Sequence, residues 1–102
     1  MTMNPDDLAF VKNFTRKVDQ RKGECFDASF ALGLLLAIRG VPVRLHKGRV
    51  CDQKHWWLQS RDTIVDPTVA QFNFDIDYRS YITESVHSVN FESIVGYLGA
   101  EI

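Results

Sequence analysis

The sequence predicts an α+β domain in which N-terminal helices pack on a small antiparallel β-sheet. The first 40 residues carry helical patterns and helix-capping residues. The next 26 carry the alternation and turn residues that are typical of short strands. Helices followed by a run of strands indicate the α+β class. A chain of 102 residues is long enough for one modest core, so we expect a single domain spanning residues 1–102.

The first helix is predicted from its start signal. The tetrapeptide NPDD, residues 4–7, supplies a capping Asn, a Pro at the first helical position and two acids at the positive end of the helix dipole. Apolar residues then recur at helical spacing over residues 8–18, which predicts an amphipathic helix ending near Gln20.

The second helix is predicted from about Cys25 to Arg39. Between these two residues the side chains are apolar except for Asp27 and Ser29, so the helix should be central and buried. Gly40 is expected to end it.

The rest of the chain reads mainly as strands. The strand candidates are residues 41–50 with a kink at Gly48, residues 54–59, residues 62–66 and residues 81–89. Asn90 is a capping residue for a short terminal helix over residues 91–98. Residues 69–79 have no decisive pattern. The strands are close together in sequence, which favours antiparallel pairing.

Composition excludes several classes of function. A net charge of -1 argues against a nucleic-acid-binding protein. The N-terminus has no secretory signal and no apolar run reaches the ~18 residues of a membrane span, so we expect no membrane association. Two cysteines are too few for a disulfide scaffold. Together these observations predict a cytoplasmic protein with reduced thiols.

Cys25 is the first candidate for chemistry. The backbone N–H groups of a first helical turn have no intrahelical partner and carry partial positive charge, which stabilises a thiolate placed there. The same N–H groups can hold an oxyanion. The alternative is that Cys25 is simply a small core residue.

His55 and Asp66 are the second candidates. If residues 55–59 and 62–66 pair through a tight turn at Ser60 and Arg61, His55 lies directly opposite Asp66 on the same face of the hairpin. A carboxylate there would fix the imidazole tautomer and leave the other ring nitrogen to serve a thiol. The alternative is a chance His–Asp pair on a solvated face.

Four sequence features in this order resemble the transglutaminase-like superfamily, whose core is papain-like. They are Gly-x-Cys opening an apolar helix, then Gly-Val-Pro-Val, His-Trp-Trp-Leu and Ile-Val-Asp-Pro-Thr, and they cover residues 23–71. The resemblance implies that Cys25 is the nucleophile, His55 the base and Asp66 the orienting acid. It implies a thiol hydrolase that cleaves amide, peptide or ester bonds through an acyl-enzyme. A protease, including one that removes leader peptides, falls in this class.

Two other functions stay open. The same acyl-enzyme could serve glutamine deamidation or transamidation. Alternatively, the chain is a non-catalytic protein-binding module that uses a surface formed by Trp56 and Trp57. These tryptophans are also the substrate-binding candidates in the enzyme, whose substrate would be a protein or peptide. By analogy with papain-like enzymes, Gln20 is the candidate for the oxyanion hole, although a surface glutamine is an equal alternative. The chain is short, so a partner protein is a candidate to complete the substrate groove.

We expect no metal and no cofactor. Four residues could in principle form a zinc site, but they lack the paired spacing of zinc ligands. They are Cys25, His46, Cys51 and His55. Cys51 is expected to be a spare thiol, and His46 and His87 are expected to be solvated.

Overall fold

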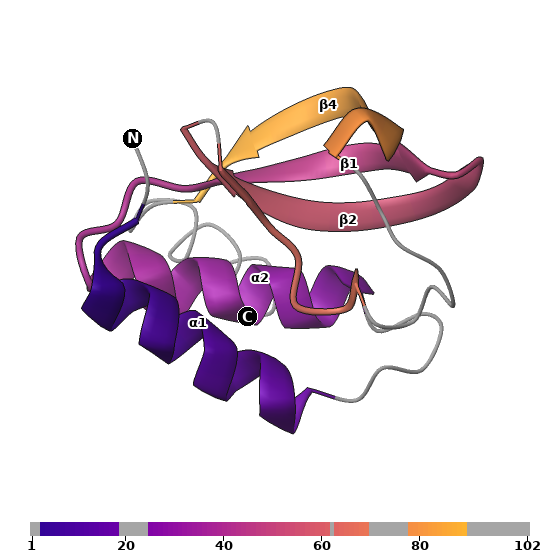
Figure 1. Cartoon of the computed structure of the whole chain (residues 1–102). Coiled ribbons are helices and arrows are strands. Elements are labelled where there is room, and N and C mark those ends of the chain that lie inside the picture. The colour runs from indigo at the N-terminus through magenta and orange to yellow at the C-terminus, as the bar shows by residue number, and fades with distance from the viewer. Residues whose placement is uncertain (1–2, 19–24, 62, 70–77, 90–102) are drawn as a thin grey trace, which may run out of the picture.

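In the part of the chain that the structure describes, two α-helices lie on the same side of a four-stranded antiparallel sheet, as the computed structural model in Figure 1 shows. The structure describes residues 3–18, 25–61, 63–69 and 78–89. The elements are α1 (Pro5–Lys17), α2 (Cys25–Ile38), β1 (Arg44–Val50), β2 (Gln53–Ser60), β3 (Thr63–Val65), a 3-10 turn (Tyr78–Ser80) and β4 (Tyr81–Ser88). The strand order is β3-β2-β1-β4. The predicted α+β class and antiparallel sheet are confirmed, while the terminal helix predicted at 91–98 lies outside the described residues.

Helix α1 begins as its sequence predicts. The side chain of Asn4 accepts a hydrogen bond from the backbone N–H of Asp7 at 2.9 Å, and Pro5 occupies the first turn. Asp7 is also buried and accepts from Arg39 Nε at 3.0 Å, which joins the start of α1 to the end of α2. The helix ends at Lys17, before the expected end near Gln20, which itself lies outside the described residues.

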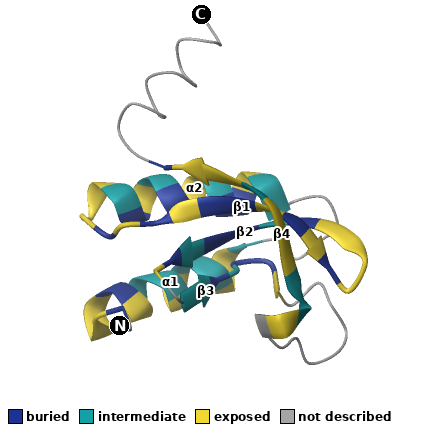
Figure 2. Cartoon of the chain, turned by 90° about the horizontal axis from the view of Figure 1, so that it is seen from above, coloured by how far each residue is buried: buried dark blue, intermediate teal, exposed yellow. Residues whose placement is uncertain are grey.

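Helix α2 supplies the centre of the core. Leu32 and Leu36 are fully buried and pack with Leu45 of β1 and Leu58 of β2. Figure 2 colours the ribbon by burial and accordingly shows buried residues in α2, β1 and β2. The helix ends at Ile38, and Gly40 terminates it as expected, with a φ of 82°. The backbone N–H groups of residues 40 and 41 bond back to the carbonyls of residues 37 and 36, which is a Schellman motif.

The long hairpin of β1 and β2 forms the middle of the sheet. Its two-residue turn consists of Cys51 and Asp52, both with positive φ, as tight hairpins of right-handed twist require. The register of β1 against β4 shifts between Lys47 and Gly48, where the sequence predicts a kink. A Cβ atom at Gly48 would overlap the carbonyl oxygen of Ile82 and touch the Trp57 indole, so the bulge requires glycine there.

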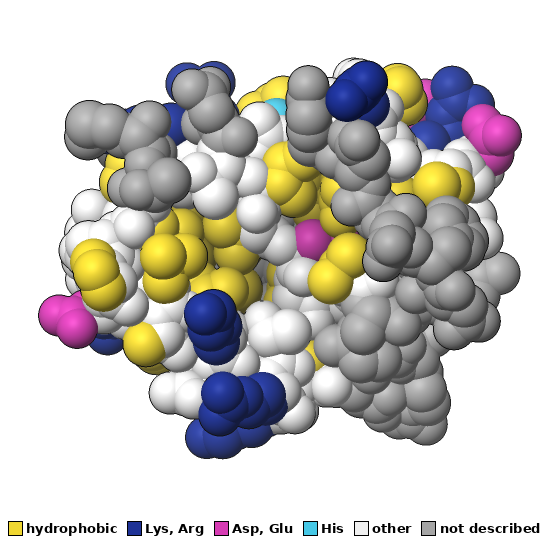
Figure 3. Space-filling view, in the orientation of Figure 1, with side chains coloured by type: hydrophobic (Ala, Val, Ile, Leu, Met, Phe, Trp, Pro, Cys, Tyr) yellow, Lys and Arg dark blue, Asp and Glu magenta, His cyan; other side chains and the backbone are white. Residues whose placement is uncertain are grey.

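The surface of α1 is basic. Figure 3 shows Lys and Arg side chains over this helix, and the exposed cations of α1 are Lys12, Arg16 and Lys17. Within the described ranges, neither helix combines the length and the apolarity that crossing a lipid bilayer demands.

Candidate active site

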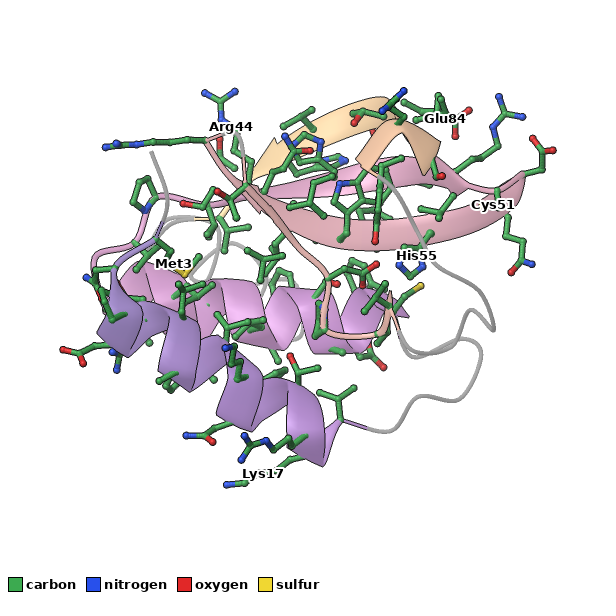
Figure 4. The ribbon with its side chains drawn as sticks, viewed as in Figure 1. Met3, Lys17, Arg44, Cys51, His55 and Glu84 are labelled. Atoms are coloured by element: carbon green, nitrogen blue, oxygen red, sulfur yellow. The ribbon has the colours of Figure 1, made fainter. Side chains whose placement is uncertain are left out.

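The structure brings His55 and Asp66 into direct contact. His55 Nε2 lies 2.7 Å from Asp66 Oδ2, and the two side chains are only 1% and 3% exposed. His55 projects from β2 toward the N-terminal end of α2, as Figure 4 shows. Asp66 directly follows β3. A buried His–Asp pair of this kind fixes both the ring orientation and the tautomer of the histidine.

The register predicted to produce this contact is wrong by two residues. Ser60 pairs with Thr63 and Leu58 pairs with Val65, so the turn falls after Ser60, at Arg61, which has a φ of 56°. Continuing this register places Asp66 opposite residue 57, and His55 one diagonal step away. The contact survives because side chains alternate between faces with a period of two, so residues 55 and 57 point to the same side. Diagonal neighbours on one face are still within reach of long side chains.

The carboxylate of Asp66 is saturated with hydrogen bonds. Its Oδ1 accepts from the backbone N–H of Thr68 at 3.1 Å and from the Thr68 hydroxyl at 3.2 Å. Its Oδ2 accepts from His55 and from the Tyr81 hydroxyl, which lies 2.9 Å away. Thr68 is completely buried. The carboxylate therefore has a fixed rotamer, with two donors on each of its oxygens.

Cys25 reaches the same histidine from the first turn of α2. Its thiol hydrogen-bonds to the His55 side chain and to the backbone of Trp56. The Ser29 hydroxyl, one helical turn further on, donates to the carbonyl oxygen of Trp56 at 3.2 Å. Residues 25 and 29 share a helix face. Strand β3 pairs with β2 at residues 58–60, so Trp56 lies beyond the end of that pairing.

The two titrating partners change each other's pKa. Burial raises the pKa of the Cys25 thiol, but the hydrogen bonds to His55 and to the Trp56 backbone outweigh it, so that the pKa is lowered overall. Burial disfavours the imidazolium of His55, yet the hydrogen bonds to Asp66 and Cys25 prevail and raise its pKa to about 9. Both shifts are in the direction that favours a thiolate facing an imidazolium.

The two tryptophans differ in their accessibility. Trp57 is completely buried and its indole stacks along the His55 ring, with centroids 6.2 Å apart. It therefore supports the histidine and presents no surface to a substrate, contrary to the expectation for this residue. Trp56 is half-buried and packs edge-on against Phe26 at 4.8 Å. Of the two, Trp56 remains the candidate for a substrate contact.

The remaining candidates lie in the β1–β2 hairpin and in β4. Cys51 is exposed at the tip of the β1–β2 hairpin (Figure 4). His46 is buried, stacked on Trp57 and hydrogen-bonded to the Thr83 hydroxyl at 3.0 Å, so the expectation of a solvated side chain is wrong. His87 is exposed as expected. Among the residues that the structure describes, no three His, Cys, Asp or Glu side chains form a metal-binding group.

Sequence reasoning missed three residues that hold this site together. They are Ser29, Thr68 and Tyr81. Ser29 carried a detectable signal, since it is one of two polar side chains in an otherwise apolar helix. Tyr81 carried none, because its contact with Asp66 spans 15 residues and a segment without a decisive pattern. The oxyanion candidate Gln20 lies outside the described residues.

Comparisons with known proteins assign no family to the chain. No family model, curated protein or solved structure matches it.

Proposed function

We propose that the protein is a small thiol hydrolase that cleaves amide bonds in a peptide or protein through an acyl-enzyme. The observation that carries the proposal is the line of three groups, in which the buried His55 contacts Asp66 on one side and the thiol of Cys25 on the other. The resemblance of residues 23–71 to the transglutaminase-like superfamily supports the same assignment, and with it a papain-like core.

In the proposed first step, the Cys25 thiolate attacks the carbonyl carbon of the substrate and forms a tetrahedral intermediate. Collapse of this intermediate breaks the C–N bond and leaves a thioester on Cys25. The proton on His55 goes to the departing amine, so that a free amine leaves and neutral imidazole remains.

In the second step, His55 takes a proton from water as that water attacks the thioester. The carboxylic acid product leaves, and the thiolate and imidazolium are restored. Asp66 stays ionised throughout and stabilises the imidazolium, which is the role of the third member in such triads. The backbone N–H of Cys25 at the start of α2 is a donor for the oxyanion, since it has no partner within the helix.

Hydrolysis is preferred over transfer because water is always available as the acceptor of the acyl group. Amine transfer needs in addition a second pocket that binds the amine and excludes water. Removal of a leader peptide is a reaction within this class, and a partner protein is a candidate to complete the substrate groove.

The test uses a mixed peptide library, incubated with the protein in the presence and absence of a dansylated primary amine. A hydrolase shortens or deamidates peptides in both samples and incorporates little dansyl label. Cys25→Ala abolishes these products and Cys51→Ser, its matched control, retains them. Efficient dansylation that depends on Cys25 would instead show a transferase.

Equal product profiles from the unmodified protein and Cys25→Ala would overturn the enzyme proposal. If peptides are then retained on both proteins without being changed, the chain is a binding module.

A further inference from the structure

Tyr81 contacts the oxygen of Asp66 that also accepts a hydrogen bond from His55. Its hydroxyl donates to Asp66 Oδ2 at 2.9 Å, and His55 Nε2 lies 2.7 Å from this same atom. Tyr81 is the first residue of β4, which ends the sheet on the side opposite to β3. Its side chain therefore reaches a carboxylate at the other end of the sheet, and the contact does not follow from strand pairing.

Packing fixes the position of the Tyr81 ring. The ring meets the Trp57 indole edge-on, with centroids 5.0 Å apart and planes at 66°. The same indole stacks nearly parallel to the His55 ring, at 16°. Tyr81 and His55 thus rest on one buried side chain, which is 0% exposed, and both point at one oxygen atom. Burial and the Asp66 carboxylate raise the pKa of Tyr81, so the hydroxyl keeps its proton and stays a donor in alkaline solution.

We propose that Tyr81 is a positioning residue of the active site, which acts on His55 through Asp66. By donating to Oδ2, the hydroxyl prevents rotation of the carboxylate and withdraws part of its charge from the imidazolium. The inference deepens the proposed function and rests on it.

The direction of the effect follows from charge. Without the Tyr81 hydroxyl, Oδ2 keeps His55 as its partner and interacts with the imidazolium more strongly. A more strongly bound imidazolium is a weaker acid, so it gives its proton to the leaving amine less readily. A purely structural tyrosine would change stability but would leave the titration of His55 unchanged.

The experiment compares Tyr81→Phe with Thr83→Val. The first variant keeps the ring on Trp57 and removes only the hydroxyl. The second removes a hydroxyl from the same strand, where its partner is His46 and not Asp66. The His55 ring is titrated by NMR, and the rate of Cys25 alkylation is measured against pH. In Tyr81→Phe we expect the pKa of His55 to rise by about 0.5 to 1 unit. We also expect kcat/KM to fall by roughly 3- to 10-fold with KM unchanged. In Thr83→Val the titration of His55 should not move.

A second variant keeps the test decisive if Tyr81→Phe does not fold. 3-Fluorotyrosine at position 81 is a stronger donor of the same shape, and it should shift the pKa of His55 in the opposite direction. An unchanged His55 titration in whichever variant folds would overturn the proposal, even if the protein is an active hydrolase. A shifted titration in a protein without turnover would support Tyr81 as a positioning residue and contradict the proposed function.

Discussion

At the scale of single residues, the two cysteines provide the most direct contrast. Cys25 has a lowered pKa and faces His55, whereas Cys51 is exposed in a hairpin turn. Because the thiolate is the reactive form, limiting iodoacetamide near pH 6 should label Cys25 before Cys51, as mass mapping of the labelled peptides would show.

His55→Ala is the control for this labelling, since it removes the group that stabilises the thiolate. We expect the preference for Cys25 to disappear in this variant and in denaturant. Preferential labelling of Cys51 in the folded protein would contradict the thiolate–imidazolium pair.

Asp66 allows a second prediction at this scale. Asp66→Asn replaces an acceptor of four hydrogen bonds by an amide that must turn its NH₂ group toward a donor, so we expect a stability loss of about 1 to 3 kcal/mol. The amide also cannot stabilise the imidazolium. Turnover at a temperature where the variant is fully folded should therefore fall by roughly 10³- to 10⁴-fold.

Glu84→Gln is the matched control for Asp66→Asn. Glu84 is an exposed carboxylate, 53% accessible, that lies 3.7 Å from Arg49. Its substitution should change neither folding nor turnover measurably. Near-normal turnover in Asp66→Asn would mean that Asp66 only shapes the turn at Pro67 and Thr68.

At the scale of elements, the contact between α2 and β2 sets the distance between nucleophile and base. Ser29→Ala removes the hydrogen bond that joins the helix to the carbonyl of Trp56, next to His55. We expect a stability loss of about 1 kcal/mol. We also expect slower alkylation of Cys25, measured near pH 6, because the first turn of α2 is no longer held against the strand.

Ser60→Ala serves as the matched control, since the Ser60 hydroxyl is likewise buried and donates to a carbonyl, that of Pro42. It should cost a similar amount of stability and leave the reactivity of Cys25 unchanged. Equal alkylation rates in the two variants would show that Ser29 is not needed to place the thiol.

The elements of this fold were largely predictable, because their signals are local. The cap at Asn4 and the stop at Gly40 each depend on a few neighbouring residues, and both appear where the sequence predicts them. The hairpin register did not follow from the sequence, because Ser60 and Arg61 form no strong turn motif and either residue could begin the turn. His55 contacts Asp66 all the same, because the shift in the register of β3 against β2 leaves both side chains on the same face of the sheet.

The site was less predictable than the elements. Cys25, His55 and Asp66 could be proposed from residue type and local context. The buried state of Trp57 could not, because it depends on Tyr81 and on residues brought together by the whole sheet. Tyr81 contributes through a contact between distant segments, which no local pattern encodes.

At the scale of the whole molecule, the site is assembled from four separate parts of the chain. Cys25 begins α2, His55 lies in β2, Asp66 follows β3 and Tyr81 begins β4. These residues become neighbours only when the helices and the complete sheet are in place. Reactivity of Cys25 is therefore a measure of tertiary structure and not of helix content.

The position of Tyr81 on β4 has a consequence for heat inactivation. This strand ends the sheet and exposes apolar side chains, with Ile82 and Val86 accessible to 52% and 45%. For a strand with so few buried side chains, the free energy of detachment is lower than the free energy of unfolding the core. Each detachment would take Tyr81 away from Asp66 while α2 and the central hairpin stay intact. We expect turnover to decline, reversibly, several degrees below the midpoint of the circular-dichroism transition. Coincident loss of turnover and ellipticity would show that β4 melts only with the core. If turnover falls at a lower temperature than ellipticity, detachment of β4 at the sheet edge abolishes activity while the rest of the fold is still intact.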